Sequence, residues 1–291
     1  MFVSGFTIAR NVIKYDYPIR EAISSVLPLC DEFVVAVGRS EDDTLDYIRS
    51  IGSEKIRIVE TVWDDSLRQG GRVLAEETNK ALDAVSEKAD WAFYIQADEC
   101  LHEKYLPTVR ETMLRYKDDL ETDGLLFHYL HFWGSYRYVA DSRNWYRKEI
   151  RVVRKNPEIR SYRDAQGFRK QDGSKLKVRQ VDAYMHHYGW VRDAEKQILK
   201  NADFQRLWHE GESLEERVKK VLEFDYSDID SLKLFDGTHP QVMEARMAEY
   251  NFDFHPDLSK KNLSLKDKLL AGIEKYTGYR VGEYKNYKLI R

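Results

Sequence analysis

The chain has 291 residues, enough to bury a sizeable core either as one large α/β domain with an appendage or as two small domains. Hydrophobic residues make up 42% of the chain and charged residues 33%, a globular balance that excludes a disordered chain. The 47 basic and 50 acidic side chains leave a net charge of -3, so the overall charge does not indicate a nucleic-acid partner.

The cysteines and the apolar segments indicate the cellular compartment in which we expect the protein. Cys30 and Cys100 lie far apart and in no metal-ligand spacing, so the sequence predicts free thiols in a reducing compartment. The first residues lack the pattern of a signal peptide, and no stretch approaches the roughly 20 apolar residues of a membrane span. We therefore expect a cytoplasmic protein with no transmembrane segment.

The first 130 residues alternate between strand-like and helix-like patterns. In chain order, these patterns predict a strand at 2–9, a helix at 18–29, a strand at 32–37, a helix at 45–51, a strand at 55–62, a helix at 72–85 and strands at 91–95 and 124–128. Asp43 or Thr44 is the expected cap of the second helix. The alternation predicts βαβ units in a mainly parallel sheet, whose connections bring the carboxyl ends of the strands to one edge. Ligands of such sheets bind outside that edge.

After residue 130 the pattern changes. Strand-like runs at 131–139, 149–155 and 175–187 are separated by polar loops, and from residue 191 the chain is mostly helical and highly charged. The predicted architecture is an α/β domain over residues 1–190, with a Rossmann-like mixed sheet flanked by helices, and a mainly helical C-terminal extension over residues 191–291. Neither a G-x-G-x-x-G fingerprint after the first strand nor a P-loop motif occurs, which disfavours dehydrogenases and P-loop proteins.

Acidic residues follow two of the predicted strands. The segment WAFYIQADE ends an apolar strand with Asp98 and Glu99, and a carboxylate in that position is costly to bury without a partner. A divalent cation is a natural partner, because Mg²⁺ and Mn²⁺ favour carboxylate oxygens. The alternative is that Asp98 caps the next helix, which we expect to begin near His102. The acids of GRSEDD, after the strand at 32–37, can accept hydrogen bonds from a ribose, or they form an ordinary acidic loop.

Two later segments also carry groups suited to chemistry. His186 and His187 are adjacent in a strand-like run, so one of them faces the edge where Asp98 lies and could bind Mn²⁺. The alternative is one packed and one exposed histidine. Asp164 stands among arginines in RSYRDAQGFR, which predicts a depressed pKa and an ionised carboxylate that could act as a general base. The alternative reading of that segment is a surface salt-bridge loop.

Taken together, these segments resemble the inverting family-2 glycosyltransferases with the GT-A fold. The resemblance covers about the first 190 residues and depends on the order of its motifs and their positions at strand ends. The motifs are TIARN (7–11), GRSEDD, GGRVLAEETNKAL (70–82), YIQADE, YRDAQGF (162–168) and HHYGW. The resemblance implies that residues 1–190 form a GT-A catalytic domain that binds a nucleoside-diphosphate sugar.

The resemblance also implies roles for single residues. The donor-binding residues would be Ala9, Arg10, Asn11, Gly38, Asp42, Asp43, Arg72, Asn79, Gln96 and Ala97. The ligands of a divalent metal, Mn²⁺ or Mg²⁺, would be Asp98 and either His187 or His186. Gln96 stands where the family's Asp-x-Asp motif has its first acid, which leaves Asp98 as the sole carboxylate ligand unless Glu99 joins it.

The implied reaction is hexosyl transfer to an acceptor hydroxyl with inversion. Asp164 matches the family's catalytic base, and the metal offsets the charge that develops on the departing nucleoside diphosphate. The acceptor would be a glycan such as a growing polysaccharide, a lipid-linked sugar or a protein. A lipid-linked acceptor would require peripheral membrane association, for which the basic, tyrosine-rich residues 276–291 are the candidate; the alternative is an exposed charged terminus. We expect the extension to form a helical cap beside the acceptor cleft.

Two other functions stay open. A sugar-phosphate nucleotidyltransferase would use a similar sheet and metal, but it needs a glycine-rich, basic loop after the first strand, which TIARNVIKYD lacks. A catalytically inactive interaction protein of the same fold is the second alternative, and Gln96 is the residue that keeps it open.

Overall fold

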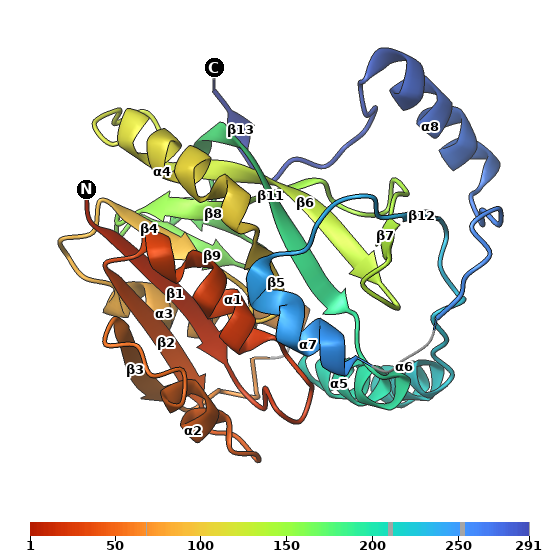
Figure 1. Ribbon diagram of the computed structural model, residues 1–291, viewed down its shortest axis with the longest axis horizontal. Coiled ribbons are helices and arrows are strands. Elements are labelled where there is room, and N and C mark those ends of the chain that lie inside the picture. Colours follow the sequence, from red (N-terminus) through yellow and green to blue (C-terminus); the bar gives the residue numbers. More distant parts are fainter. Residues whose placement is uncertain (68, 209–211, 251–253, 291) are drawn as a thin grey trace.

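The structure is a computed structural model that describes residues 1–67, 69–208, 212–250 and 254–290. Within these residues, one mixed sheet of 11 strands runs through the molecule (Figure 1). Four parallel strands form its first half, in the spatial order β3 (Ile56–Thr61), β2 (Glu32–Gly38), β1 (Val3–Ala9) and β4 (Trp91–Tyr94). This is the strand order of a doubly wound sheet, with its switch point between β1 and β4.

The second half of the sheet is mixed. β8 (Lys148–Arg154) lies antiparallel between β4 and β6 (Gly124–Trp133), and β11 (Lys177–Trp190) pairs with β6 in parallel. The shorter strands of this half are β5 (Glu99–Leu101), β7 (Tyr138–Ala140), β12 (Leu232–Leu234) and β13 (Lys288–Leu289). A separate two-stranded sheet is made by β9 (Ile159–Tyr162) and β10 (Gly167–Lys170).

Helices cover both faces of the parallel strands, because successive residues of a strand point to opposite sides. Phe33 and Val35 of β2 pack with α1 (Ile19–Val26) and α4 (Leu106–Arg115), whereas Val34 and Ala36 pack with α3 (Arg72–Ala84). The other helices are α2 (Thr44–Arg49), α5 (Ala194–Trp208), α6 (Glu212–Leu222), α7 (Glu244–Glu249) and α8 (Leu265–Thr277), with short 3-10 turns at Leu27–Leu29, Gln69–Gly71, Glu103–Tyr105 and Gln241–Met243.

The predicted α/β class is confirmed: a Rossmann-like mixed sheet flanked by helices, followed by a helical extension. Each of the eight elements expected before residue 130 begins within one residue of its observed start. The single strand expected at 131–139 is wrong, because β6 ends at Trp133 and the chain turns at Gly134, whose φ of 67° favours glycine. Thr44 does not cap α2. It is the first residue of that helix, and its hydroxyl accepts a hydrogen bond from the Val12 amide at 2.9 Å.

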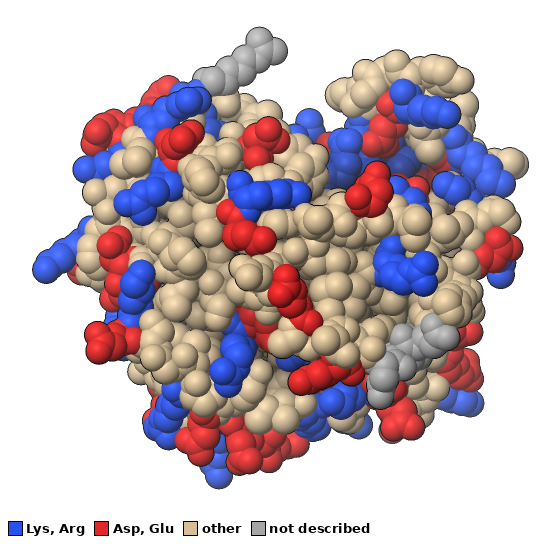
Figure 2. All heavy atoms as spheres, viewed as in Figure 1, with Lys and Arg blue, Asp and Glu red and all other residues tan. Residues whose placement is uncertain are grey.

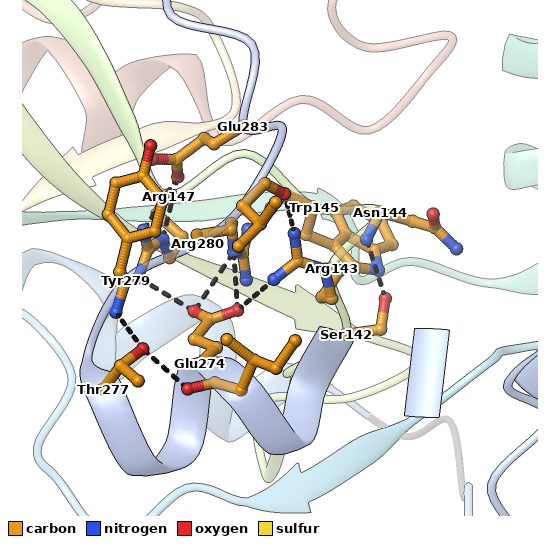
Figure 3. Close-up of polar contacts among 12 residues, drawn as sticks. Ser142, Arg143, Asn144, Trp145, Arg147, Glu274, Thr277, Tyr279, Arg280 and Glu283 are labelled. Carbon is orange, nitrogen blue, oxygen red and sulfur yellow. Dashed lines mark hydrogen bonds and ion pairs between the residues drawn. The ribbon is translucent and has the colours of Figure 1, made fainter. Parts of the chain in front are cut away.

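The C-terminal extension returns to the body of the molecule. In Figure 1, α8 lies apart from the sheet, and the chain after it runs back to β13, which pairs with β11. The carboxylate of Glu274 in α8 accepts hydrogen bonds from Arg143 (2.7 Å), Arg147 (3.0 Å) and Arg280 (3.0 Å), as Figure 3 shows. Arg147 also pairs with Glu283 at 2.9 Å. This Glu274 cluster ties α8 and the segment after it to the loop before β8.

The surface and the thiols agree with the composition. Basic and acidic side chains are interspersed over the face drawn in Figure 2. Cys30 and Cys100 are both buried free thiols, as expected. In the part of the chain that the structure describes, no helix combines the length and apolarity that a membrane crossing requires.

Candidate functional site

A cavity of about 620 Å³ lies at the carboxyl ends of β1 and β4. Of the predicted site residues, those that line it are Ala9, Arg10, Gln96, Ala97, Asp98, Asp164 and His187. A second cavity of about 390 Å³ contains Asn11, Lys14 and Glu41. The two cavities adjoin, because they share Arg10, Tyr17, Trp63, Leu74, Lys200 and Phe204. One cleft therefore extends from the loop after β1 to the end of β11.

The carboxylate of Asp98 faces this cleft and is buried. Its Oδ2 lies 3.1 Å from Lys200 Nζ, and its Oδ1 lies 3.8 Å from His187 Nε2. Burial alone would raise the pKa of Asp98, but its cationic surroundings, Lys200 first among them, outweigh burial and hold the pKa well below its usual range. The capping alternative is excluded, because His102 caps the next turn by accepting a hydrogen bond from the Lys104 amide. Asp98 is thus an ionised carboxylate directed at the cleft.

The neighbouring acid, Glu99, belongs to the core instead. Arg151 donates to both of its oxygens, at 2.8 Å and 2.7 Å, and neither side chain has any solvent exposure. The Tyr129 hydroxyl donates to Glu99 at 2.7 Å. Because these contacts occupy both oxygens, Glu99 does not join Asp98 at the cleft.

The two adjacent histidines point to opposite faces of β11, as predicted. His187 faces Asp98, whereas His186 is packed among aromatic rings on the other face, away from Asp98. His131 donates its Nε2 proton to the Tyr146 carbonyl at 2.7 Å, so its Nδ1 accepts the Nδ1 proton of His187 at 3.0 Å. Burial lowers the pKa of His131 and of His187, which keeps both rings neutral. The His187 Nε2 lone pair therefore faces the Asp98 carboxylate.

This arrangement fits a divalent cation. An imidazole lone pair and a carboxylate oxygen at 3.8 Å are too far apart to hydrogen-bond, yet a cation that approaches each at about 2.1 Å fits between them. Gly189 leaves the space clear: a Cβ there would lie 2.6 Å from His187 Nε2 and 3.0 Å from Asp98 Oδ2. Among the described residues, no group of three His, Cys, Asp or Glu side chains gathers at this place, so the remaining ligands would come from substrate and water.

Asp164 lines the same cleft, in the turn between β9 and β10. Its neighbours Arg163 and Ala165 both have left-handed backbones, with φ of 56° and 61°, which is costly for residues other than glycine. Residues in such conformations cluster at functional sites, where the surrounding structure holds them in place. One contact that stabilises this turn is a hydrogen bond from the side-chain amide of Gln96 to the Ala165 carbonyl at 3.3 Å. Gln96, one of the predicted donor-binding residues, thus helps to position the turn that carries Asp164.

The depressed pKa expected for Asp164 is wrong. Burial raises the pKa of Asp164 and outweighs the opposing charge of the adjacent Arg163, whereas the other two flanking arginines have partners elsewhere. Arg160 pairs with Asp83 of α3, and Arg169 donates to Asn286 at 2.7 Å. A carboxylate with a raised pKa is a better proton acceptor than the one the sequence suggested.

The acidic loop after β2 reaches the cleft through a different residue than expected. Glu41 lines the second cavity, whereas Asp42 accepts hydrogen bonds from the backbone amides of Lys14 (2.7 Å) and Thr44 (3.1 Å). Asp43 is exposed at the start of α2. Gly38 packs against the Trp63 indole, and a Cβ there would lie 2.3 Å from its Nε1. The loop therefore shapes the second cavity mainly through backbone contacts.

Two residues of α3 lie away from both cavities. Arg72 is mostly exposed and lies 3.7 Å from Glu76 on its own helix. The Asn79 side chain accepts a hydrogen bond from the Ser161 amide at 2.8 Å, which ties α3 to β9. Asn79 thus supports the turn that carries Asp164.

Residues beyond the first 190 complete the cleft, and the sequence pattern did not predict them. One face of α5 supplies Gln197, Lys200, Asn201 and Phe204. Their spacing of three and one residues is helical, but polar residues at such spacing usually face solvent, so no signal distinguished them. Burial lowers the pKa of Lys200 to about 8, and Arg192 beside it acts in the same direction. The far end of the cleft is aromatic, with Trp133, Tyr146, Trp190 and Phe224.

Comparison with known proteins gives distant likenesses only. No protein-family model and no curated protein sequence matches the chain. Among solved structures, S. aureus TarS residues 1–349 is 12% identical over 76% of this chain and 71% of that one, with a TM-score of 0.38. Glucosyl-3-phosphoglycerate synthase from Mycobacterium tuberculosis, in complex with Mn²⁺, UDP and phosphoglyceric acid, is 20% identical over 45% of this chain and 43% of that one, with a TM-score of 0.31.

A third likeness is 4-diphosphocytidyl-2C-methyl-D-erythritol synthase from Anaerococcus prevotii. It is 16% identical over 70% of this chain and 98% of that chain, with a TM-score of 0.36. All three scores lie below 0.5, so the fold assignment stands on the strand order itself.

Proposed function

We propose that the chain is a glycosyltransferase that moves a sugar from a nucleoside-diphosphate sugar to an acceptor hydroxyl with inversion. The observation that supports this most is the convergence of Asp98, His187 and Asp164 on one cleft at the carboxyl ends of β1 and β4. That edge is where ligands of doubly wound sheets bind. The cleft continues past Arg10 to Asn11, which gives room for a nucleoside beyond the diphosphate.

The proposal includes a divalent cation, Mn²⁺ or Mg²⁺, at Asp98 and His187. These two residues would hold it, and Gly189 keeps the space beside them clear. When bound, the cation would offset the negative charge that develops on the leaving diphosphate. His131 keeps the His187 ring in the tautomer whose Nε2 lone pair is available, so it acts as a positioning residue.

Asp164 is the proposed general base. Its carboxylate takes the proton of the acceptor hydroxyl as that oxygen bonds to the anomeric carbon. The bond from the anomeric carbon to the diphosphate breaks in the same displacement, and its electron pair leaves on the phosphate oxygen. Attack opposite the leaving group inverts the anomeric carbon. The raised pKa of Asp164 suits this role, because a buried carboxylate holds a proton more tightly.

The remaining parts of the proposal concern the acceptor and the extension. Residues 1–190 would form the catalytic domain, and the extension, residues 191–291, would close the cleft through α5. The aromatic end of the cleft, at Trp133 and Trp190, would receive the acceptor, a glycan, lipid-linked sugar or protein. We place the protein in the cytoplasm. For a lipid-linked acceptor, exposed side chains such as Tyr276 would support peripheral membrane docking.

A thermal-shift screen tests the proposal, because a ligand that binds only the folded protein raises its melting temperature. UDP- and GDP-sugars are screened with Mn²⁺ and with EDTA, and we expect at least one donor to stabilise the protein more strongly with Mn²⁺. Products then identify the reaction: glycosyl transfer releases a nucleoside diphosphate, whereas nucleotidyl transfer releases pyrophosphate. Release of pyrophosphate, or no stabilisation by any nucleotide sugar, would contradict the proposal.

A further inference from the structure

Lys200 lies at the junction of the two cavities. It is one of the residues that line both of them, and its side chain is 14% exposed. In a nucleoside-diphosphate sugar, the diphosphate lies between the nucleoside and the sugar. If the nucleoside lies near Asn11 and the transferred sugar near Asp164, as proposed above, the diphosphate passes this junction. The junction is therefore the place where a cation of the protein would meet the phosphates.

Of the described residues that line both cavities, two have cationic side chains, and they differ in their partners. Arg10 donates to both oxygens of Asp65, at 2.7 Å and 3.2 Å, and its guanidinium lies 5.1 Å from the centre of the Trp63 ring. Lys200 has a different pair of contacts: Asp98 Oδ2 and the Gly189 carbonyl, each at 3.1 Å. An ammonium has three N–H donors, so these two contacts leave one for a phosphate oxygen.

The charge balance also favours a phosphate ligand here. Asp98 alone would repel a diphosphate, because both are negative and the cleft is partly shielded from water. The Lys200 ammonium neutralises the Asp98 carboxylate and adds a hydrogen-bond donor that strengthens as charge develops on the leaving group. A Lys side chain supplies this charge whether or not a divalent cation is bound.

Contacts between α5 and the loop after β1, on the opposite side of the cleft, position Lys200. Asp203, on the same face of α5, accepts hydrogen bonds from the Tyr15 hydroxyl at 2.6 Å and from Lys14 Nζ at 3.1 Å. The Lys200 ammonium also lies 4.7 Å from the centre of the Tyr17 ring. Contacts with the loop after β1 thus hold α5 over the cleft.

We propose that Lys200 is a direct ligand of the donor's diphosphate and stabilises it as it leaves. This inference rests on the proposed function and adds to it a residue from α5, outside the first 190 residues. The chemical group that Lys200 would recognise is a diphosphate, common to all nucleoside-diphosphate sugars.

The test compares Lys200→Met with Lys196→Met, an exposed lysine on the same helix that serves as the matched control. Isothermal titration calorimetry measures the affinity for inorganic pyrophosphate, UDP and GDP, at saturating Mn²⁺ and in EDTA. In each condition in which the unaltered protein binds, we expect Lys200→Met to bind at least about tenfold more weakly, the loss typical of one charged hydrogen bond. Lys196→Met should bind like the unaltered protein, and Lys200→Arg should recover part of the loss.

A second readout separates a phosphate ligand from a purely structural residue. Mn²⁺ alone is titrated into Lys200→Met, which should retain or increase its Mn²⁺ affinity, because Asp98 loses a competing cation. Loss of Mn²⁺ and pyrophosphate binding together would assign Lys200 a structural role and overturn the inference. If Lys200→Met folds poorly, the double variant Lys200→Met/Asp98→Asn is used, because it leaves no unpaired charge. Its pyrophosphate affinity in EDTA is compared with that of Asp98→Asn.

Two outcomes separate the inference from the proposed function. Equal pyrophosphate, UDP and GDP affinities for Lys200→Met and the unaltered protein would overturn the inference and leave the glycosyltransferase proposal standing. An unaltered protein that binds no nucleoside diphosphate or pyrophosphate in either condition would overturn both.

Discussion

Glu99 and Arg151 form a two-hydrogen-bond ion pair with no solvent exposure, one residue along the chain from the carboxylate that faces the cleft. The pair joins the start of β5 to β8, so the adjacent acids Asp98 and Glu99 have separate roles. One carboxylate holds the sheet edge together, and the other is available to a ligand. The two acids differ in role because their side chains point to different sides of the backbone.

Removing the charge of Glu99 should destabilise the fold. Glu99→Gln leaves the Arg151 guanidinium buried without its counter-charge, and breaking such a pair costs about 3–5 kcal/mol. Urea denaturation measures the change in unfolding free energy. The control is Asp83→Asn, whose partner Arg160 is partly exposed, and there the change should stay within about 1 kcal/mol. A similar small loss in both variants would show that the buried pair is not a major source of stability.

Asp98 should be essential for metal-dependent donor binding. Asp98→Ala removes the carboxylate proposed to hold the cation, and we expect it to abolish the Mn²⁺-dependent part of UDP or GDP binding in calorimetry. Asp46→Ala, at an exposed acid of α2, is the control and should bind normally. Donor affinity like that of the unaltered protein would remove Asp98 from the site.

Gly189 should be intolerant of even one methyl group. Its backbone is not left-handed, so Gly189→Ala is not strained in itself, but the new Cβ would enter the space between His187 Nε2 and Asp98 Oδ2. We expect Mn²⁺ affinity to fall about tenfold or more, because the added methyl group occupies the space that the cation would need, and a loss of about 1.4 kcal/mol in binding free energy is already tenfold. Gly272→Ala has open space around it and is the control. Unchanged Mn²⁺ binding by Gly189→Ala would place the cation elsewhere.

Asp164 should affect turnover more than binding. Asp164→Asn cannot accept the acceptor's proton, so we expect turnover to fall about 10²- to 10⁴-fold with donor affinity largely intact. Because burial raises the pKa of Asp164, activity of the unaltered protein should decline, as pH falls, at a higher pH than for an ordinary aspartate. Collapse of donor affinity in Asp164→Asn would place Asp164 in the binding site and not in proton transfer.

Glu149 should make stability depend on pH. Burial raises the pKa of Glu149 from its usual 4.5 to about 8, and its Oε2 has no hydrogen-bond partner. The folded chain then keeps a proton that the unfolded chain releases, so stability should fall as pH rises from about 4.5 to about 8. Glu149→Gln should be more stable than the unaltered protein at the upper end of this window, by on the order of a few kcal/mol.

Urea denaturation at the two ends of this window measures the effect. The exposed Glu158→Gln is the control and should follow the unaltered protein at both ends. If Glu149→Gln shows the same pH dependence as the unaltered protein, Glu149 is not the group responsible.

The sequence predicted most of the sheet, because its information is local. The apolar run at 32–37 and the turn residues after it define β2 without reference to any other segment. Asp98 and His187 were predictable for a similar reason, since each follows from strand direction and alternation. Asp164 does line the cleft, but the direction of its pKa shift was not predicted, because Arg160 and Arg169 have partners on α3 and near the C-terminus, which only the folded chain reveals.

The residues of the cleft that the sequence could not predict come from segments far away along the chain. Lys200 meets Asp98 across 102 residues of sequence, and nothing in the local pattern of α5 marks its inner face. Asn79 is the converse case. It falls in a motif that suggested donor binding, yet its hydrogen bond to Ser161 supports the neighbouring turn. Tertiary partners decide such roles.

Through the Glu274 cluster, the C-terminal segment stabilises the loop before β8. Arg280 donates to the Trp145 carbonyl at 3.0 Å, and the next carbonyl, of Tyr146, receives the proton of His131. A shortened version that stopped before α8 would leave Arg143 and Arg147 facing each other without a carboxylate between them. Removing the tail would therefore weaken the support of the His131–His187 pair, although none of the described residues after α8 lines the cavity that holds Asp98.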